Sequence, residues 1–189
     1  MSNTLLQSSL NKSRVDKFKL VFQVPNALKS INVNTRSNST VIQDTMQFSI
    51  YGSIVPPITV PAIEIRYAGS TLYNSSHNKL PYPPVTVNFT IDNEYTNYWV
   101  IYKWLNLLHG QNNGIYDETN IVESDTFNEY QTDMTIFGLD EFNNPIIKFN
   151  YTKSFPTELG GINFNYRESG EIESSFTFVY SQLHTTLLS

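Results

Sequence analysis

The chain repeatedly alternates apolar and polar residues, and this period of two restricts its fold more than any other feature. The clearest example lies near the end, where the apolar residues of one parity are Ile172, Phe176, Phe178 and Tyr180. Successive side chains of a β-strand point to opposite faces, so the pattern predicts an antiparallel strand with one buried face over residues 171–183. We expect it to pair with a strand over residues 161–166 through a tight turn.

The same alternation predicts six further strands. They cover residues 18–24, 44–51, 60–67, 85–91, 132–139 and 145–152. A short polar stretch with Asn and Pro separates the last two, which predicts a hairpin. The segments at 44–51 and 60–67 are expected to pair with each other, with Ile63, Ile65 and Tyr67 facing inward. The stretch from Gly69 to Pro84 is rich in Ser, Asn and Pro and predicts a long loop.

One segment follows a helical period instead. Between Asp92 and Gly110, apolar residues recur every three or four positions and form one stripe, made of Tyr95, Tyr98, Tyr102, Leu105 and Leu108 and widened by Trp99. We expect Asp92 or Asn93 to cap the first turn and Gly110 to end the helix. Trp104 falls outside the stripe, and we expect it to face a second protein surface.

Together these elements predict a mainly β protein, a two-sheet β-sandwich or incomplete barrel of about eight antiparallel strands with one α-helix. A chain of 189 residues suits a single domain, which we place at residues 15–183. This leaves an N-terminal arm at residues 1–14 and a C-terminal tail at residues 184–189. The arm carries Leu5, Leu6 and Leu10 without a partner of its own, so we expect contacts across an interface to order it.

The composition disfavours several classes of function. A formal net charge of -5 disfavours a protein that grips nucleic acid through its phosphates. The chain has no cysteine, which excludes thiolate metal sites and disulfides. His77, His109 and His184 have no carboxylates at the spacing of metal ligands. We therefore expect no metal site and no cofactor.

The sequence also contains no nucleotide-binding loop and no nucleophile elbow, so we expect no enzyme activity. The neighbouring carboxylates Asp92 and Glu94 are explained by capping of the predicted helix. No apolar stretch approaches the roughly 20 residues that span a membrane, and the first residues are polar. We expect a soluble protein that is made in the cytoplasm and has no membrane partner.

The order of these elements resembles that of the tail tube protein of contractile-tailed bacteriophages, over about residues 15 to 183. The most specific part is the end of the chain, where an aromatic-Pro-Thr turn precedes two alternating segments. These residues are Phe155, Pro156 and Thr157, then Ile162, Phe164 and Tyr166, then Ile172, Phe176, Phe178 and Tyr180. The long segment from Gly69 to Pro84 departs from the family pattern.

The resemblance implies a virion protein that is assembled in the host cytoplasm and forms hexameric rings. Each subunit would contribute strands to one larger β-barrel, and stacked rings would form the inner tail tube that conducts DNA without binding it specifically. The implied partners are further copies of the chain and the tail sheath, baseplate and tail terminator proteins. Two alternatives remain open: a baseplate tube-initiator ring, and a β-sandwich carbohydrate-binding module of a phage fibre.

Two sets of polar residues on the predicted strands are candidates for the lumen of such a tube. They alternate with apolar residues that would form the core: Gln47, Ser49, Glu64 and Arg66 in the first set, and Asp133, Thr135, Lys148 and Asn150 in the second. The pattern alone fits the solvent-facing side of a monomeric sandwich equally well. The family resemblance favours the lumen.

Overall fold

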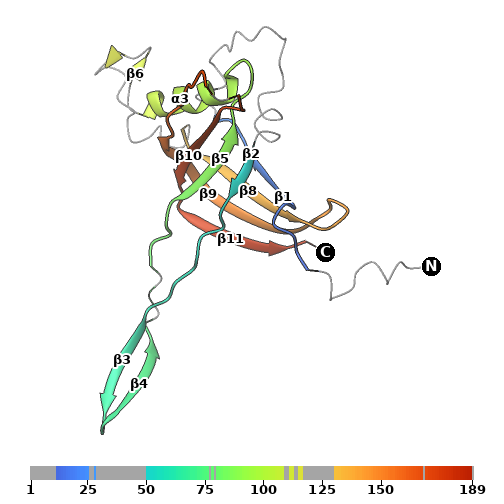
Figure 1. The fold of residues 1–189 in the computed structure, drawn as a ribbon. Coiled ribbons are helices and arrows are strands. Elements are labelled where there is room, and N and C mark those ends of the chain that lie inside the picture. The colour runs from blue at the N-terminus through green and yellow to red at the C-terminus, as the bar shows by residue number, and fades with distance from the viewer. Residues whose placement is uncertain are drawn as a thin grey trace, which may run out of the picture.

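The computed structural model has a mainly β fold with one α-helix over the residues that it describes (Figure 1). These are residues 12–25, 28, 50–76, 78, 80–108, 111–112, 115–116, 130–167 and 169–188. The predicted arm residues Leu5, Leu6 and Leu10 lie outside them, as do Gln47 and Ser49. Seven of the eleven strands in the described residues belong to one antiparallel system.

A long, bent hairpin forms the centre of this system. One arm is β9 (Pro145–Leu159), and the other consists of β10 (Glu173–Val179) followed by β11 (Gln182–Leu187). The register continues across residues 180–181, because Val179 pairs with Phe155 and Gln182 pairs with Thr152. Thus β10 and β11 form one ladder along β9, and β11 crosses the boundary at residue 183 that the sequence suggested between domain and tail.

The system divides into two halves, because β9 changes neighbours along its length. Its first part lies between β8 (Thr132–Leu139) and β11, and β1 (Phe18–Phe22) pairs with the outer side of β8; we call these strands the β8 half. Its second part continues through β10 and β5 (Val85–Thr90) to β2 (Ile50–Ser53), which we call the β5 half.

The bend between the two halves lies at Lys153, whose φ of 52° is unusual for a residue other than glycine. The Asp133 carboxylate accepts a hydrogen bond from the Lys153 backbone N–H at 3.1 Å. A shift in the β8–β9 register occurs at the same place, between Thr132 and Met134. A bulge of this kind bends a strand and lets it pass from one sheet to the next.

The apolar faces of both halves and the helix enclose one hydrophobic core. Its buried members come from α3, from every strand of the two halves except β2, and from the segment after β1: Leu20, Phe22, Leu28, Val85, Val87, Phe89, Val100, Ile101, Trp104, Met134, Ile136, Tyr151, Phe176, Phe178 and Leu183. The alternation predicted at residues 18–24, 85–91 and 171–183 is confirmed, since Phe176 and Phe178 are buried and Glu173 is exposed. The predicted hairpin of β8 and β9 is confirmed as well.

The helix α3 (Thr96–Leu108) begins as predicted from Asp92. The two oxygens of the Asp92 carboxylate accept hydrogen bonds from the backbone N–H groups of Thr96 at 2.7 Å and Asn97 at 3.3 Å. These donors have no partner within the first helical turn, so the carboxylate stabilises the helix start. The predicted end at Gly110 lies outside the described residues.

The buried face of α3 differs from the predicted stripe. Val100, Ile101 and Trp104 are buried, whereas Tyr102, which was expected to face the core, is 43% exposed. Trp104 therefore does not face a second protein: its indole N–H donates to the Tyr130 carbonyl at 2.8 Å. A tyrosine tolerates an exposed position because its hydroxyl binds water, whereas the larger indole gains more from burial.

The strand pairing predicted for residues 44–51 and 60–67 is wrong. Instead β3 (Ala62–Tyr67) pairs with β4 (Ser70–Ser75), and β2 pairs with β5. The turn between β3 and β4 consists of Ala68 and Gly69, both with positive φ, as a two-residue hairpin turn requires. The long loop predicted from Gly69 to Pro84 therefore contains a strand.

A second prediction that is wrong concerns residues 161–166, which form no strand. The chain between β9 and β10 is irregular there, and Phe164 and Tyr166 are exposed. The partners of β10 are β9 and β5. Two further pairs of residues, β6 (Gln111–Asn112) and β7 (Ile115–Tyr116), form a small separate ladder near α3 (Figure 1).

Two buried tyrosine hydroxyls lie where the halves meet. The Tyr180 ring lies 4.8 Å from the Tyr151 ring and 5.2 Å from the Tyr82 ring, measured between centroids. The hydroxyls of Tyr151 and Tyr180 have no hydrogen-bond partner among the described residues. Burial of the hydroxyl and, to a smaller extent, the nearby Tyr82 raise the pKa of Tyr180 to about 12.

We expect Tyr180→Phe to leave the free energy of unfolding at neutral pH within about 1 kcal/mol of the original value, because the lost hydroxyl makes no hydrogen bond. At high pH the variant should be the more stable protein. The pKa of Tyr180 is higher in the folded protein than in the unfolded chain. Its contribution to the free energy of unfolding is therefore fully present below about pH 10 and is lost as pH rises through about 12. Urea unfolding at neutral and alkaline pH measures the difference. If both proteins lost the same amount of stability at alkaline pH, the ionisation of Tyr180 would not be the cause.

Candidate functional site

The outward face of the β8 half carries mostly polar side chains, which the strand register arranges in rows. One row runs Lys19, Phe137, Lys148 and Thr186 across the four strands, and the next runs Val21, Thr135, Asn150 and His184. Within the second row, the Thr135 hydroxyl donates to the side-chain oxygen of Asn150 at 2.9 Å. We call this surface the polar wall.

The structure brings together four of the eight residues predicted to line a lumen. Thr135, Lys148 and Asn150 share the polar wall, and Asp133 lies at its end beside the bend. Glu64 and Arg66 lie on β3 instead, in the separate hairpin. The two sets therefore do not form one surface.

The two outer strands, β1 and β11, contribute residues to this wall that were not predicted. Lys19 and Val21 have the parity opposite to buried Leu20 and Phe22, so the predicted strand at residues 18–24 already contained the signal. His184 and Thr186 lie in a segment that was expected to be a tail. Their polar sequence gave no sign that β9 would pair with them.

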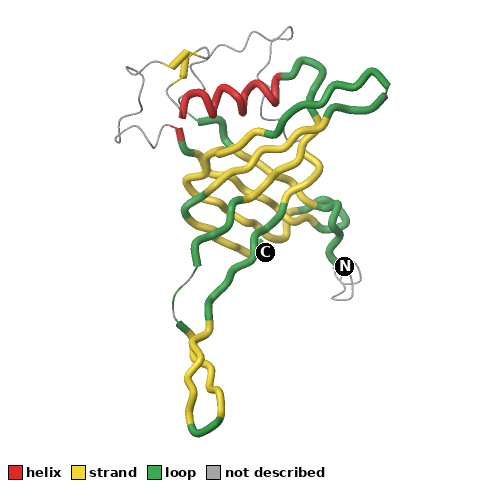
Figure 2. The backbone as a smooth tube through the Cα atoms, turned by 60° about the vertical axis from the view of Figure 1, so that its left-hand side comes forward, coloured by secondary structure: helices red, strands yellow, loops and turns green. Residues whose placement is uncertain are grey.

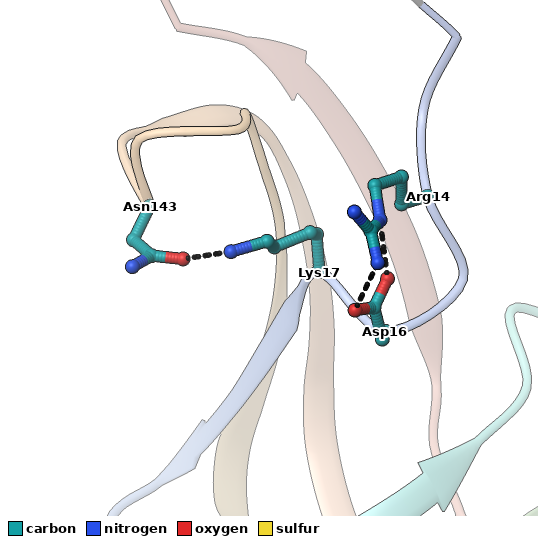
Figure 3. A network of polar contacts seen from close by, with 4 residues as sticks. All are labelled: Arg14, Asp16, Lys17 and Asn143. Atoms are coloured by element: carbon teal, nitrogen blue, oxygen red, sulfur yellow. Dashed lines mark hydrogen bonds and ion pairs between the residues drawn. The ribbon is translucent and has the colours of Figure 1, made fainter.

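A network of polar contacts fixes β1 beside the β8–β9 turn (Figure 3). The Lys17 ammonium donates to the side-chain oxygen of Asn143 at 2.7 Å, and the Arg14 guanidinium pairs with Asp16 at 3.0 Å. Asp140 accepts hydrogen bonds from the N–H groups of the turn, including Asn144 at 2.7 Å, and these bonds lower its pKa. Two acidic groups at the rim of the polar wall, Asp16 and Asp140, are therefore already engaged.

The β8 half ends in two strand edges. β1 pairs only with β8, and β11 pairs only with β9, among the strands that the structure describes. Their outer backbone N–H and C=O groups can therefore pair with further strands. The sheet is open, and the polar wall extends from one edge to the other.

The hairpin of β3 and β4 projects away from both halves (Figures 1 and 2). All residues of its two strands are exposed. One of its faces is largely apolar, since Ile65 pairs with Leu72 across the strands and Ile63 and Tyr67 share that face. An isolated two-stranded hairpin is at best marginally stable in water, so this face is suited to contact with another surface.

Metal and membrane chemistry find no support in the described parts of the chain. No three His, Asp or Glu residues gather there in a way that would hold a metal ion. No helix in these parts is long and apolar enough to cross a membrane.

The family comparison agrees with this architecture. A sequence model of the phage tail tube protein family matches residues 13–186. The chain belongs to this family. The resemblance seen in the order of its elements is thereby confirmed, and the family is one of structural tube proteins found in phage tails. Among curated proteins, none matches the sequence.

Solved structures of contractile injection systems share the fold of this tail tube protein. A chain of the PVC sheath–tube complex in the extended state aligns with a TM-score of 0.60 and 13% identity, covering 100% of both chains. A chain of the PVC sheath/tube terminator aligns with a TM-score of 0.57 and 14% identity, covering 95% of this chain and 99% of that one. A chain of the anti-feeding prophage baseplate, described as 6-fold symmetrised, aligns with a TM-score of 0.57 and 11% identity, covering 93% and 96%.

Proposed function

We propose that this tail tube protein assembles into hexameric rings in which the β8 halves join edge to edge, and that stacked rings form a conduit for phage DNA. The observation that carries the proposal is the open β8 half, whose polar wall ends in the unpaired edges of β1 and β11. Joining the β1 edge of one copy to the β11 edge of the next would satisfy both rows of backbone groups and close the sheet into a barrel.

Closure of this kind would place the polar wall inside the ring. The opposite face of the β8 half is occupied by the hydrophobic core, with Leu20, Met134 and Tyr151 buried against the β5 half and α3. A barrel made from this sheet therefore has the core outside and the polar wall inside. In this arrangement Thr135, Lys148 and Asn150 would face the lumen, as would Lys19 and His184.

Rings need a second set of contacts in order to stack, and the hairpin of β3 and β4 is suited to provide them. Its apolar face with Ile63, Ile65 and Leu72 is exposed in the single chain, and a neighbouring copy would bury it. Glu64 and Arg66, on the opposite face of β3, would then lie outside both this contact and the lumen.

The implied partners are further copies of the chain, a sheath, a tail terminator and a baseplate. Similar chains come from a sheath–tube complex, a sheath/tube terminator and a baseplate with sixfold symmetry, which supports both the partner set and the hexamer. Assembly would take place in the host cytoplasm, and the finished tube would belong to the virion.

Electron microscopy of the purified protein, combined with light scattering for mass, tests the proposal. Sixfold rings that stack into tubes are expected. Rings that never stack would favour a baseplate tube-initiator. A compact 21.7 kDa monomer at all concentrations would contradict assembly and favour a carbohydrate-binding sandwich module.

A further inference from the structure

Two lysines on the polar wall have no acidic partner in the part of the chain that the structure describes. Lys19 on β1 and Lys148 on β9 lie in one row on either side of Phe137. Because β8 lies between them, the strands β1 and β9 are about 10 Å apart. Neither ammonium group lies within 4.0 Å of a carboxylate among the described residues. A lysine on an exposed strand face without a counter-charge is free to meet an anion from outside.

Three aspartates on or beside the polar wall already have partners of their own. Asp133, on the same face, is held at the bend by its hydrogen bond from the Lys153 N–H. At the rim, Asp16 is paired with Arg14, and Asp140 accepts hydrogen bonds from the N–H groups of its own turn. The polar wall thus carries two lysines against one aspartate, although the whole chain has a net charge of -5.

Apart from Phe137 and Val21, the residues around the lysines have side chains that can form hydrogen bonds. Thr135, Asn150, Thr186 and His184 lie in the same and the adjacent row. Lysine together with Thr and Asn side chains is the set that proteins use against phosphate and sugar oxygens of nucleic acids, where contacts position the polymer without reading its sequence. An acidic polypeptide would offer carboxylates to the lysines but would need pockets for its side chains.

We propose that the Lys19–Lys148 row makes direct, sequence-independent contacts with the phosphates of double-stranded DNA. This deepens and rests on the proposed function, because ring assembly would repeat the row around the lumen. Individual lysine–phosphate contacts are weak and are screened by salt, but a ring multiplies them. The wall therefore contacts the duplex through many weak interactions, and movement of DNA through it depends on ionic strength.

Binding of a fluorescein-labelled duplex to the purified, assembled protein, measured by anisotropy over a range of salt concentrations, tests this inference. The double variant Lys19→Gln/Lys148→Gln should bind the duplex at least about tenfold more weakly at low salt. The slope of log K against log salt should fall by about one for each lysine. The control Lys103→Gln, which removes a lysine lying 5.6 Å above the Trp99 ring on α3, should behave as the unaltered protein.

Three results would overturn the inference: an equal loss in the Lys103→Gln control, a duplex affinity that does not depend on the two lysines, or binding of poly-glutamate as tight as that of the duplex. Thermal unfolding checks that each variant is folded. Electron microscopy of the same samples separates the two proposals. Tubes that do not bind the duplex contradict the phosphate contacts and leave the tube intact, whereas protein that forms no rings contradicts the proposed function.

Discussion

Replacing Phe178 by aspartate should leave no soluble, folded protein. The Phe178 side chain is 0% exposed, and its ring lies 5.4 Å from the ring of Tyr151 and 6.3 Å from that of Phe176. An unpaired carboxylate at this position would have no donor and no water. The cost of at least several kcal/mol is comparable with the whole stability of a domain of this size, about 5–15 kcal/mol.

The matched control is Thr177→Asp on the neighbouring residue. The Thr177 hydroxyl lies on the other face of β10, 3.1 Å from the Thr86 hydroxyl, and an aspartate there stays in contact with solvent. The opposite residue on β9 is Glu158, so we expect a cost of about 1 kcal/mol from like charges. Soluble yield and circular dichroism after expression measure both variants. Equal tolerance of the two aspartates would mean that the faces of β10 are reversed.

Local chemistry made much of the fold predictable. Parity alone identifies the buried residues of β1, β5 and β10, because a strand with one buried face must alternate. A polar stretch with Asn and Pro between two alternating segments predicts the β8–β9 hairpin, and Asp92 predicts the start of α3. Each of these features depends on residues that are close in sequence.

Pairing between distant segments could not be predicted in the same way. Alternation shows that β3 is a strand but not which strand lies beside it, and the turn at Ala68 and Gly69 lacks the Asn-Gly or Asp-Gly sequence that marks such hairpins most clearly. β11 is polar on one side and short, so only its ladder with β9 gives it order. The buried face of α3 likewise depends on the sheet beneath it, which favours Trp104 over Tyr102.

The candidate site was predictable only where its residues alternate with buried ones along a single strand. The predicted residues of β8 and β9 share the polar wall because the two strands form one hairpin. Glu64 and Arg66 have the same alternating pattern, but their strand belongs to the projecting hairpin. The apolar residues of that hairpin do not pack into the core of the subunit. An alternating pattern is also expected of a strand whose apolar face contacts a second molecule. The sequence alone does not distinguish such a strand from one that packs on the core of its own subunit.

Removing the apolar side chains of that projecting hairpin should abolish stacking of the rings and leave the subunit folded. In the double variant Ile65→Ser/Leu72→Ser, a directly paired and exposed couple on the apolar face is replaced. The hairpin strands contribute nothing to the hydrophobic core, so we expect the free energy of unfolding to change by less than about 1 kcal/mol. Burial of Ile and Leu in a contact with another copy contributes about 1.5–3 kcal/mol for each side chain, and every copy in a ring would lose it.

The control Arg66→Ser/Thr71→Ser removes the neighbouring cross-strand pair on the opposite face of the same hairpin. It truncates two exposed side chains and leaves the apolar face complete, so tubes should form at nearly the usual protein concentration. Electron microscopy gives tube length, and sedimentation gives the concentration above which tubes form. We expect the Ile65/Leu72 variant to raise that concentration at least about a hundredfold or to stop at single rings, since a few kcal/mol per contact corresponds to such a factor. Normal tubes from this variant, or equal losses in both, would show that the apolar face is not the stacking contact.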